Sequence, residues 1–281
     1  MLDREEYIEQ AHFFRALSER TEQGVSTQDL LRTVREEILS TTKLPMAIDF
    51  LTGELNLSGV FGPGMARLSH YFSKFQTFVV SAAENDRGRF DLVVGLEILE
   101  REARYRAAGA TPQGIFLFQF ECLSRNRLGY DRGLEAIAAD GIFNEAWREW
   151  IMTVRRQIGM VDLADLIYVR SEYYAEVRAR EGAQAPTEPA LFGLKEGRIA
   201  LANRRKDSLL LFSAMQRHLN YPLVPRTKPI DESRQVIPMI LRRVERLETR
   251  LKLLEEEQKG GIDLSKFYGK PLPPDDDLLD G

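Results

Sequence analysis

The chain has 281 residues, of which 43% are hydrophobic and 29% are charged, and its formal net charge is −4. A chain of this size buries enough apolar surface to fold without disulfides or metals, as one large domain or two smaller ones. Its acidic balance argues against a general attraction to nucleic acid or to anionic membranes. The single cysteine, Cys122, excludes an intrachain disulfide, and the apolar run around it predicts a buried, unreactive thiol.

The expected location is the cytoplasm. The first residues are acidic and lack the apolar stretch of a signal peptide. No apolar run reaches the length of a membrane span. Sparing use of cysteine fits a reducing compartment.

Apolar residues recur three and four positions apart through the first two thirds of the chain, which predicts successive helices. Asp3 and Glu6 form a candidate capping box for the first helix, and the Gly62-Pro63-Gly64 stretch is a firm helix breaker. Short connections between these helices predict antiparallel neighbours in an irregular array. The expected helices cover residues 3–23, 26–44, 46–57, 65–79, 89–108, 115–128, 131–139, 144–158 and 161–180.

The segment 115–128 has two interpretations. Phe116, Phe118 and Phe120 alternate along the chain, as in a strand. Thr111 followed by Pro112, however, is an N-cap followed by proline at the first helical position. We therefore expect a helix.

The sequence changes character after a Gly/Pro-containing linker at residues 182–189. Residues 190–194 and 198–202 flank a Lys-Glu-Gly turn, which predicts a short β-hairpin, and Asp207 or Ser208 then caps a helix over 209–219. The expected fold is mainly α, an irregular multi-helix domain followed by these smaller elements. The expected parts are a helical domain at 1–181, a basic β-hairpin plus helix element at 190–230, a coiled-coil oligomerisation helix at 231–259 and a disordered acidic tail at 260–281.

The strongest single signal in the sequence is a heptad pattern near the C-terminus, where apolar residues follow steps of three and four. In a parallel, in-register pair, Arg243 faces Glu248 of the partner and Arg250 faces its Glu255, so both charge pairs are opposite in sign. The pattern predicts self-association, with a dimer as the default and a trimer still open. The alternative is a helix that folds back against its own chain. The seam residues are Ile237, Ile240, Val244, Leu247, Leu251 and Leu254.

A second candidate site is basic. Residues 191–230 carry eight Lys or Arg and two acidic residues. Within them Arg204, Arg205 and Lys206 precede an expected helix N-terminus, where free N–H groups and the helix dipole favour anions. The segment predicts a site for phosphate, a nucleic-acid backbone or an acidic peptide; the alternative is a solvated turn.

The sequence shows few signs of catalytic, cofactor-binding or metal-binding sites. The three histidines are far apart, and no nucleotide-binding, metal-binding or nucleophile motif appears, so we expect no cofactor and no metal. Glu97, Glu100 and Glu102 are carboxylates that resemble acid/base groups, but their spacing to arginines predicts surface ion pairs. The leading hypothesis is a non-catalytic cytosolic scaffold or adaptor. The alternatives are an oligomeric binder of nucleic acid or another polyanion and, third, an enzyme whose site is assembled from distant helices.

Overall fold

The computed structural model describes residues 2–23, 27–85, 90–184 and 186–226. In these residues the chain forms thirteen α-helices and no strand, which confirms a mainly α fold; two isolated β-bridges join single residues. The predicted coiled coil at 231–259 and the predicted tail at 260–281 lie outside the described residues. The first seven helices are α1 (Arg4–Glu22), α2 (Thr27–Glu37), α3 (Leu44–Ser58), α4 (Gly62–Arg67), α5 (Lys74–Ala83), α6 (Leu92–Ala107) and α7 (Pro112–Arg125). The others are α8 (Tyr130–Ala138), α9 (Glu145–Gln157), α10 (Leu163–Val169), α11 (Glu172–Arg180), α12 (Leu194–Ala202) and α13 (Ser208–Leu219).

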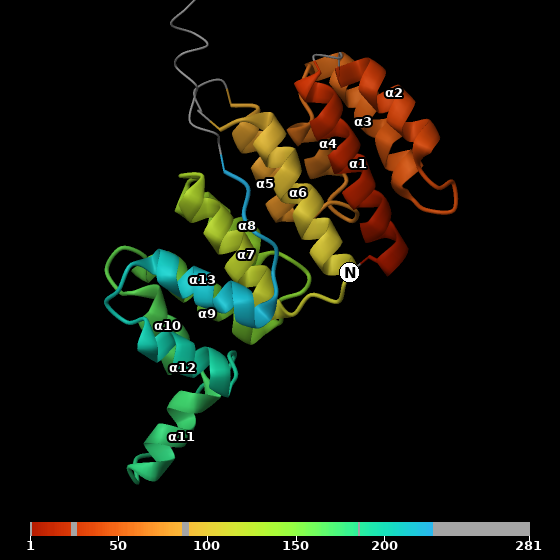
Figure 1. The fold of residues 1–281 in the computed structure, drawn as a ribbon. Helices are drawn as coiled ribbons and strands as arrows, with labels where there is room; N and C mark the ends of the chain where they lie inside the picture. The colour runs from red at the N-terminus through yellow and green to blue at the C-terminus, as the bar shows by residue number, and fades with distance from the viewer. Residues whose placement is uncertain (1, 24–26, 86–89, 185, 227–281) are drawn as a thin grey trace, which may run out of the picture. The chain divides into compact units, whose positions relative to one another are not determined.

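The N-terminal half is built around the pair of α1 and α6, which lie side by side (Figure 1). The hairpin of α2 and α3 packs on α1, and α5 packs on α6. Phe13, Phe14 and Phe72 fill the space between these helices and are almost fully buried. Burial of such large apolar side chains, at about 25 cal/mol per Å² of apolar area, is the main stabilising term of the fold.

The other half is built around α7, in which every residue from Gly114 to Leu123 is buried. Helix α8 covers one side of α7 and α13 covers another, while α9 packs on α8 (Figure 1). Phe116, Trp147, Trp150 and Phe192 form an aromatic cluster with ring centroids 4.7–6.0 Å apart. Since α7 is buried on all sides, it is the central helix of this half.

The start signals identify several helices correctly. Thr111 accepts a hydrogen bond from the Gly114 N–H at 3.2 Å, and helix α7 follows in place of the alternative strand. Asp207 caps α13 in the same way. The predicted capping box of Asp3 and Glu6 is wrong, because Asp3 makes no side-chain cap. Glu6 instead accepts the backbone N–H of Lys43 at 2.7 Å and the Tyr71 hydroxyl at 2.7 Å.

Two predicted helices are each divided in the structure. The aromatic segment 65–79 is interrupted before Ser73, which begins α5 with a capping box that pairs Ser73 and Gln76. The segment 161–180 is interrupted at Ser171, which caps α11 and forms a β-bridge with Phe192. In both cases a serine side chain accepts a backbone N–H and begins a new helix. The spacing of apolar residues alone does not predict this division.

The predicted β-hairpin at 190–202 is wrong, because residues Leu194–Ala202 form helix α12. The supposed turn contains Gly197, which is buried in the helix. A Cβ atom there would lie 2.3 Å from the Ser171 hydroxyl oxygen. This glycine lets α12 approach the start of α11 closely. A glycine that serves helix packing resembles a turn glycine in the sequence.

Residues 190–226 are attached to the earlier helices by several hydrogen bonds. Gln113 Nε2 donates to the Leu191 carbonyl at 2.7 Å, and the Tyr105 hydroxyl donates to the Leu219 carbonyl at 3.1 Å. Asn126 Nδ2 donates to the Pro225 carbonyl at 3.1 Å. These residues and the preceding helices belong to one compact unit, Met1–Thr227.

Candidate functional site

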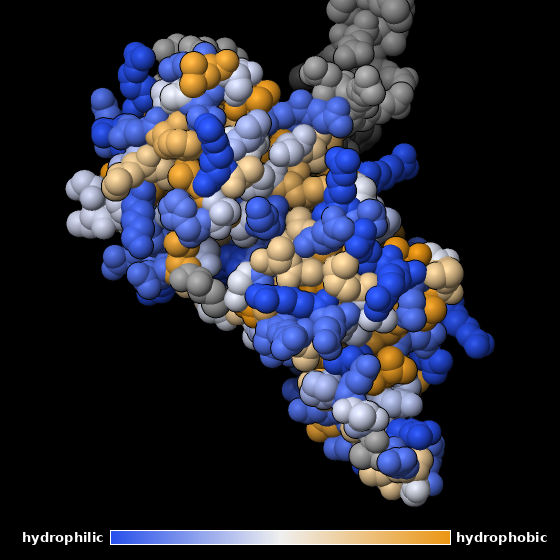
Figure 2. Space-filling model, turned by 180° about the vertical axis from the view of Figure 1, so that it is seen from behind, coloured by the Kyte–Doolittle hydropathy of each residue, from blue (hydrophilic) through white to orange (hydrophobic). Residues whose placement is uncertain are grey.

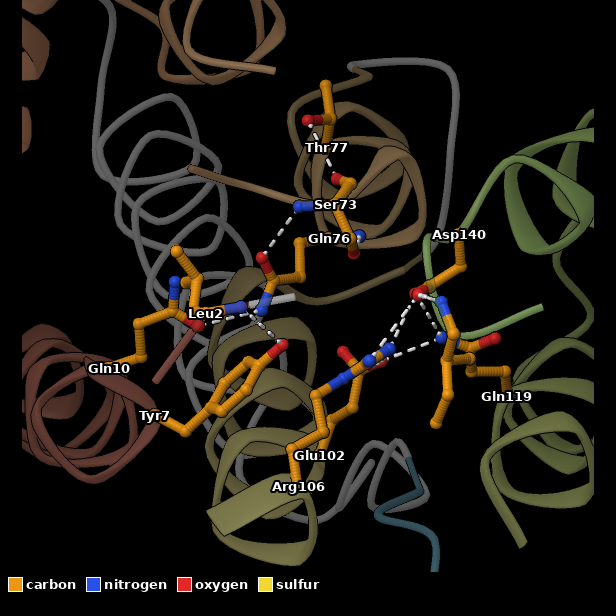
Figure 3. Close-up of polar contacts among 11 residues, drawn as sticks. Leu2, Tyr7, Gln10, Ser73, Gln76, Thr77, Glu102, Arg106, Gln119 and Asp140 are labelled. Carbon is orange, nitrogen blue, oxygen red and sulfur yellow. Dashed lines mark hydrogen bonds and ion pairs between the residues drawn. The ribbon is translucent and has the colours of Figure 1, made fainter. Parts of the chain in front are cut away.

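The described residues contain one cluster of buried charges, centred on Arg106 of α6 (Figure 3). The Arg106 side chain is 3% exposed, that of Glu102 is 0% exposed and that of Asp140 is 4% exposed. Glu102 precedes Arg106 by one helical turn, whereas Asp140 follows α8 and Gln119 comes from α7. Three segments of the chain therefore supply the charged groups and their immediate support.

The hydrogen bonds hold both carboxylates on the guanidinium. Arg106 Nη2 donates to Glu102 Oε1 at 2.7 Å and also to Asp140 Oδ2. Gln119 Nε2 donates to the same Glu102 oxygen at 2.7 Å, and the Ile142 N–H donates to Asp140 Oδ1 at 3.1 Å. Glu102 Oε2 and Gln119 Oε1 have no hydrogen-bond partner among the described residues. The carboxylate oxygens that face Arg106 are therefore hydrogen-bonded, whereas Glu102 Oε2 and Gln119 Oε1 are not.

The charges of this cluster do not balance. When all three groups are ionised, two carboxylates face one guanidinium. Burial raises the pKa of Glu102 above its usual value, although the neighbouring Arg106 charge opposes this shift. Burial lowers the pKa of Arg106, but the two carboxylates outweigh this effect and raise it overall, so the guanidinium stays charged. One extra proton would neutralise the cluster, and burial favours Glu102 as the group that takes it up.

A polar cavity of about 170 Å³ borders Arg106 and Asp140. Figure 3 shows Tyr7 and Gln76 on the opposite side of Arg106 from Gln119 and Asp140. The Arg106 guanidinium carbon lies 5.9 Å from the centre of the Tyr7 ring. The cavity is lined by Leu2, Tyr7, Ser69, His70, Tyr71, Phe72, Ser73, Gln76, Arg106, Asp140 and Gly141. A cavity of this volume takes several waters or one small polar molecule.

The sequence analysis missed this cluster. Glu97 and Glu100 form the predicted pairs with Arg101 and Arg104 on α6. The same reasoning placed Glu102 on the surface, which is wrong because Glu102 has the same helical spacing to Arg106 but points inward. The only sequence signal for this difference is the apolar face of α6, on which Leu99, Glu102 and Arg106 follow one another at three- and four-residue steps.

The predicted basic site at Arg204, Arg205 and Lys206 is exposed in the structure, in the turn before α13. Arg204 forms an ion pair with Asp165 and lies over the Tyr168 ring, 5.6 Å from its centre. The Arg205 N–H donates to Asp162 Oδ2 at 2.7 Å.

The helix N-terminus behind this basic turn is already capped. The Leu209 N–H donates to Asp207 Oδ1 at 2.9 Å, so the carboxylate of Asp207 occupies the position that a bound anion would take. Of the three cations, Arg204 is paired with Asp165. The capped helix start is less favourable to a bound anion than the free N-terminus that the sequence suggested.

The structure bears on some of the other predicted features. Cys122 is buried, and burial raises its thiol pKa well above the usual value, as expected for an unreactive cysteine. Among the described residues, no group of three or more His, Cys, Asp or Glu is arranged to hold a metal ion. In the same part of the chain, no helix is both long and apolar enough to cross a membrane. The heptad residues 237–254, with Arg243, Glu248, Arg250 and Glu255, lie outside the described residues.

Comparison with known protein families, with curated proteins and with solved structures gives no match.

Proposed function

We propose that this protein is a helical scaffold or adaptor that self-associates through a parallel coiled coil of residues 231–259. The observation that carries the proposal is the heptad seam from Ile237 to Leu254 with its two charge-matched flanking pairs. A narrow apolar seam needs a second helix to cover it, and opposite charges at the flanking positions favour a second copy of the same sequence. A dimer is the simplest assembly.

The last described residues before this part of the chain are bonded to the helical unit. The structure describes the chain to Arg226, and ten residues separate Arg226 from Ile237. Just before that point, the Pro225 carbonyl accepts a hydrogen bond from Asn126, which follows α7. Tyr221 is 2% exposed, and its hydroxyl donates to Glu121 at 2.9 Å. The segment that leads to the seam is therefore fixed to the central helix of the unit.

The first test compares two variants. One places a positive charge in the seam, and the other places the same charge outside it. Leu247→Arg puts a guanidinium at a seam position, whereas Thr249→Arg puts it two residues away, on the outer face of the proposed coiled coil. We expect Leu247→Arg to reduce the mass in light scattering to that of the 32.2 kDa chain and Thr249→Arg to leave it unchanged. Both variants should keep the melting temperature of the helical unit. A wild-type monomer at micromolar concentration would remove the basis of the proposal.

A second test checks the parallel register. Arg243→Glu with Arg250→Glu should weaken self-association, because each new glutamate faces Glu248 or Glu255 of the second copy. The complementary variant, Glu248→Arg with Glu255→Arg, should be weakened in the same way. Mixing the two variants should restore the assembly as a heteromer, which native mass spectrometry resolves. Equal association of the separate and mixed samples would contradict a parallel, in-register pair.

A further inference from the structure

Helix α3 has two apolar faces. Leu44, Ala47, Ile48, Leu51 and Leu55 are buried against the rest of the unit. On the opposite face, Met46 is 76% exposed, Phe50 is 37% exposed and Leu57 is 85% exposed. With Gly53 between them, these residues follow steps of four, three and four, which is the spacing of a helix–helix seam. We call Met46, Phe50, Gly53 and Leu57 the α3 stripe.

The α3 stripe lies on the outside of the hairpin of α2 and α3. Figure 2 shows apolar residues at the surface at the end of the unit where Figure 1 places this hairpin. Arginines from neighbouring helices neutralise the carboxylates that border the stripe, because Arg35 pairs with Asp49 and Arg67 pairs with Glu54. Two identical stripes can therefore meet without repulsion between unpaired carboxylates.

The contacts of the described residues do not explain why residue 53 is glycine. It lies in the interior of α3, where glycine is less favourable than alanine, and it does not have a positive φ. A Cβ atom at this position would meet nothing within 4 Å. The buried Gly197 and Gly133, by contrast, would each place a Cβ within 3.0 Å of another side chain. An exposed gap of this kind in an apolar stripe fits the approach of a side chain from outside the unit.

We propose that the α3 stripe pairs with the α3 stripe of a second copy, in antiparallel orientation. In this arrangement the midpoint lies between residues 51 and 52, so Phe50 meets Gly53 of the second copy and Met46 meets its Leu57. The largest side chain of the stripe then faces its gap, twice, about a two-fold axis. Self-complementary contacts of this kind are the rule for two-fold dimers.

The strength of this contact rests on the proposed coiled coil. A helix of 15 residues is about 22 Å long, and a face about 10 Å wide covers on the order of 450 Å² on two copies. Stable interfaces bury about 1,200 Å² or more in total. The α3 pair alone is therefore weak, and association elsewhere in the chain raises its effective concentration. The two contacts together also allow assemblies larger than a dimer.

Disulfide trapping tests the pairing directly, because Cys122 is buried and an added cysteine is the accessible thiol among the described residues. Met46→Cys and Leu57→Cys are prepared separately, mixed and oxidised. The antiparallel pair predicts a mixed disulfide between the two variants as the dominant dimer. Two copies of residue 46 would lie eleven residues apart along the axis, or about 16 Å, which is beyond the reach of a disulfide. Met160→Cys, 78% exposed and remote in sequence, is the matched control partner for Leu57→Cys.

The outcomes separate this inference from the proposed function. A smaller amount of the mixed disulfide when both variants also carry Leu247→Arg supports both the α3 pair and the coiled coil. Equal amounts with and without Leu247→Arg support the α3 pair and refute its dependence on the coiled coil. If each variant forms disulfides only with itself, the antiparallel pairing is overturned. If the mixed disulfide does not exceed the Met160→Cys control while light scattering shows an oligomer, the α3 pair is refuted and the coiled coil stands.

Discussion

Replacing Arg106 by leucine tests the buried charge cluster. Leucine fills part of the arginine volume but leaves Glu102 and Asp140 buried without their cation, and both lose their hydrogen bonds to the guanidinium. Removal of one member of a buried ion pair costs about 3–5 kcal/mol. We therefore expect the free energy of unfolding to fall by this amount at neutral pH. At about 2–4 °C per kcal/mol for a unit of this size, the melting temperature falls by about 6–20 °C.

Arg104→Leu is the matched control for Arg106→Leu. Arg104 lies two residues earlier on the same helix and pairs with Glu100 at the same spacing, but the Arg104 side chain is 64% exposed. The Glu100 side chain is 11% exposed but the Arg104 end of the pair is solvated, so Arg104→Leu should lower the free energy of unfolding by about 1 kcal/mol, well below the loss expected for Arg106→Leu.

Urea titration followed by circular dichroism at pH 7 measures both arginine variants. Since burial raises the pKa of Glu102, a lower pH that protonates Glu102 should narrow the stability difference between Arg106→Leu and the wild type. Equal stability of the two variants at neutral pH would refute the view that burial decides the strength of these pairs.

Three further predictions concern single residues. Burial raises the pKa of Glu102, so the native state retains this proton above the usual pKa of 4.5 and the contribution of Glu102 to stability falls as the pH rises from there. Glu102→Gln should remove this part of the pH dependence in melting curves; an unchanged slope would contradict it. Gly53→Ala should raise the free energy of unfolding by up to about 1 kcal/mol, whereas Gly197→Ala should lower it because the new methyl group meets Ser171; urea titration that shows both shifts with the same sign would contradict the packing described. Cys122 should resist thiol reagents in the native state and react at the rate of a free thiol in urea, and rapid native labelling would contradict its burial.

Local signals in the sequence predicted the helices well where a cap and an apolar face agree. Thr111 and Asp207 mark helix starts because their side chains accept backbone N–H groups within a few residues. The divisions at Ser73 and Ser171 and the helix at 194–202 escaped prediction. Ser171 and Gly197 act through contact with each other across two helices, which no local pattern contains.

The candidate site was less predictable than the fold, for a physical reason. Glu100–Arg104 and Glu102–Arg106 have the same residue types and the same spacing, yet one arginine is exposed and the other is buried. The difference comes from Asp140, which accepts a hydrogen bond from Arg106, and from Gln119, which donates to both carboxylates; both residues come from other segments of the chain. The basic segment shows the reverse case, because Asp165 of helix α10, far away in the sequence, pairs with Arg204, whose charge looks unpaired in the sequence.

The native mass of the full chain tests the central claim most directly. Light scattering across a range of micromolar concentrations should give at least twice the 32.2 kDa of one chain, and Leu247→Arg should bring the mass down to that of one chain. A wild-type mass of 32.2 kDa throughout the range would contradict self-association through residues 231–259.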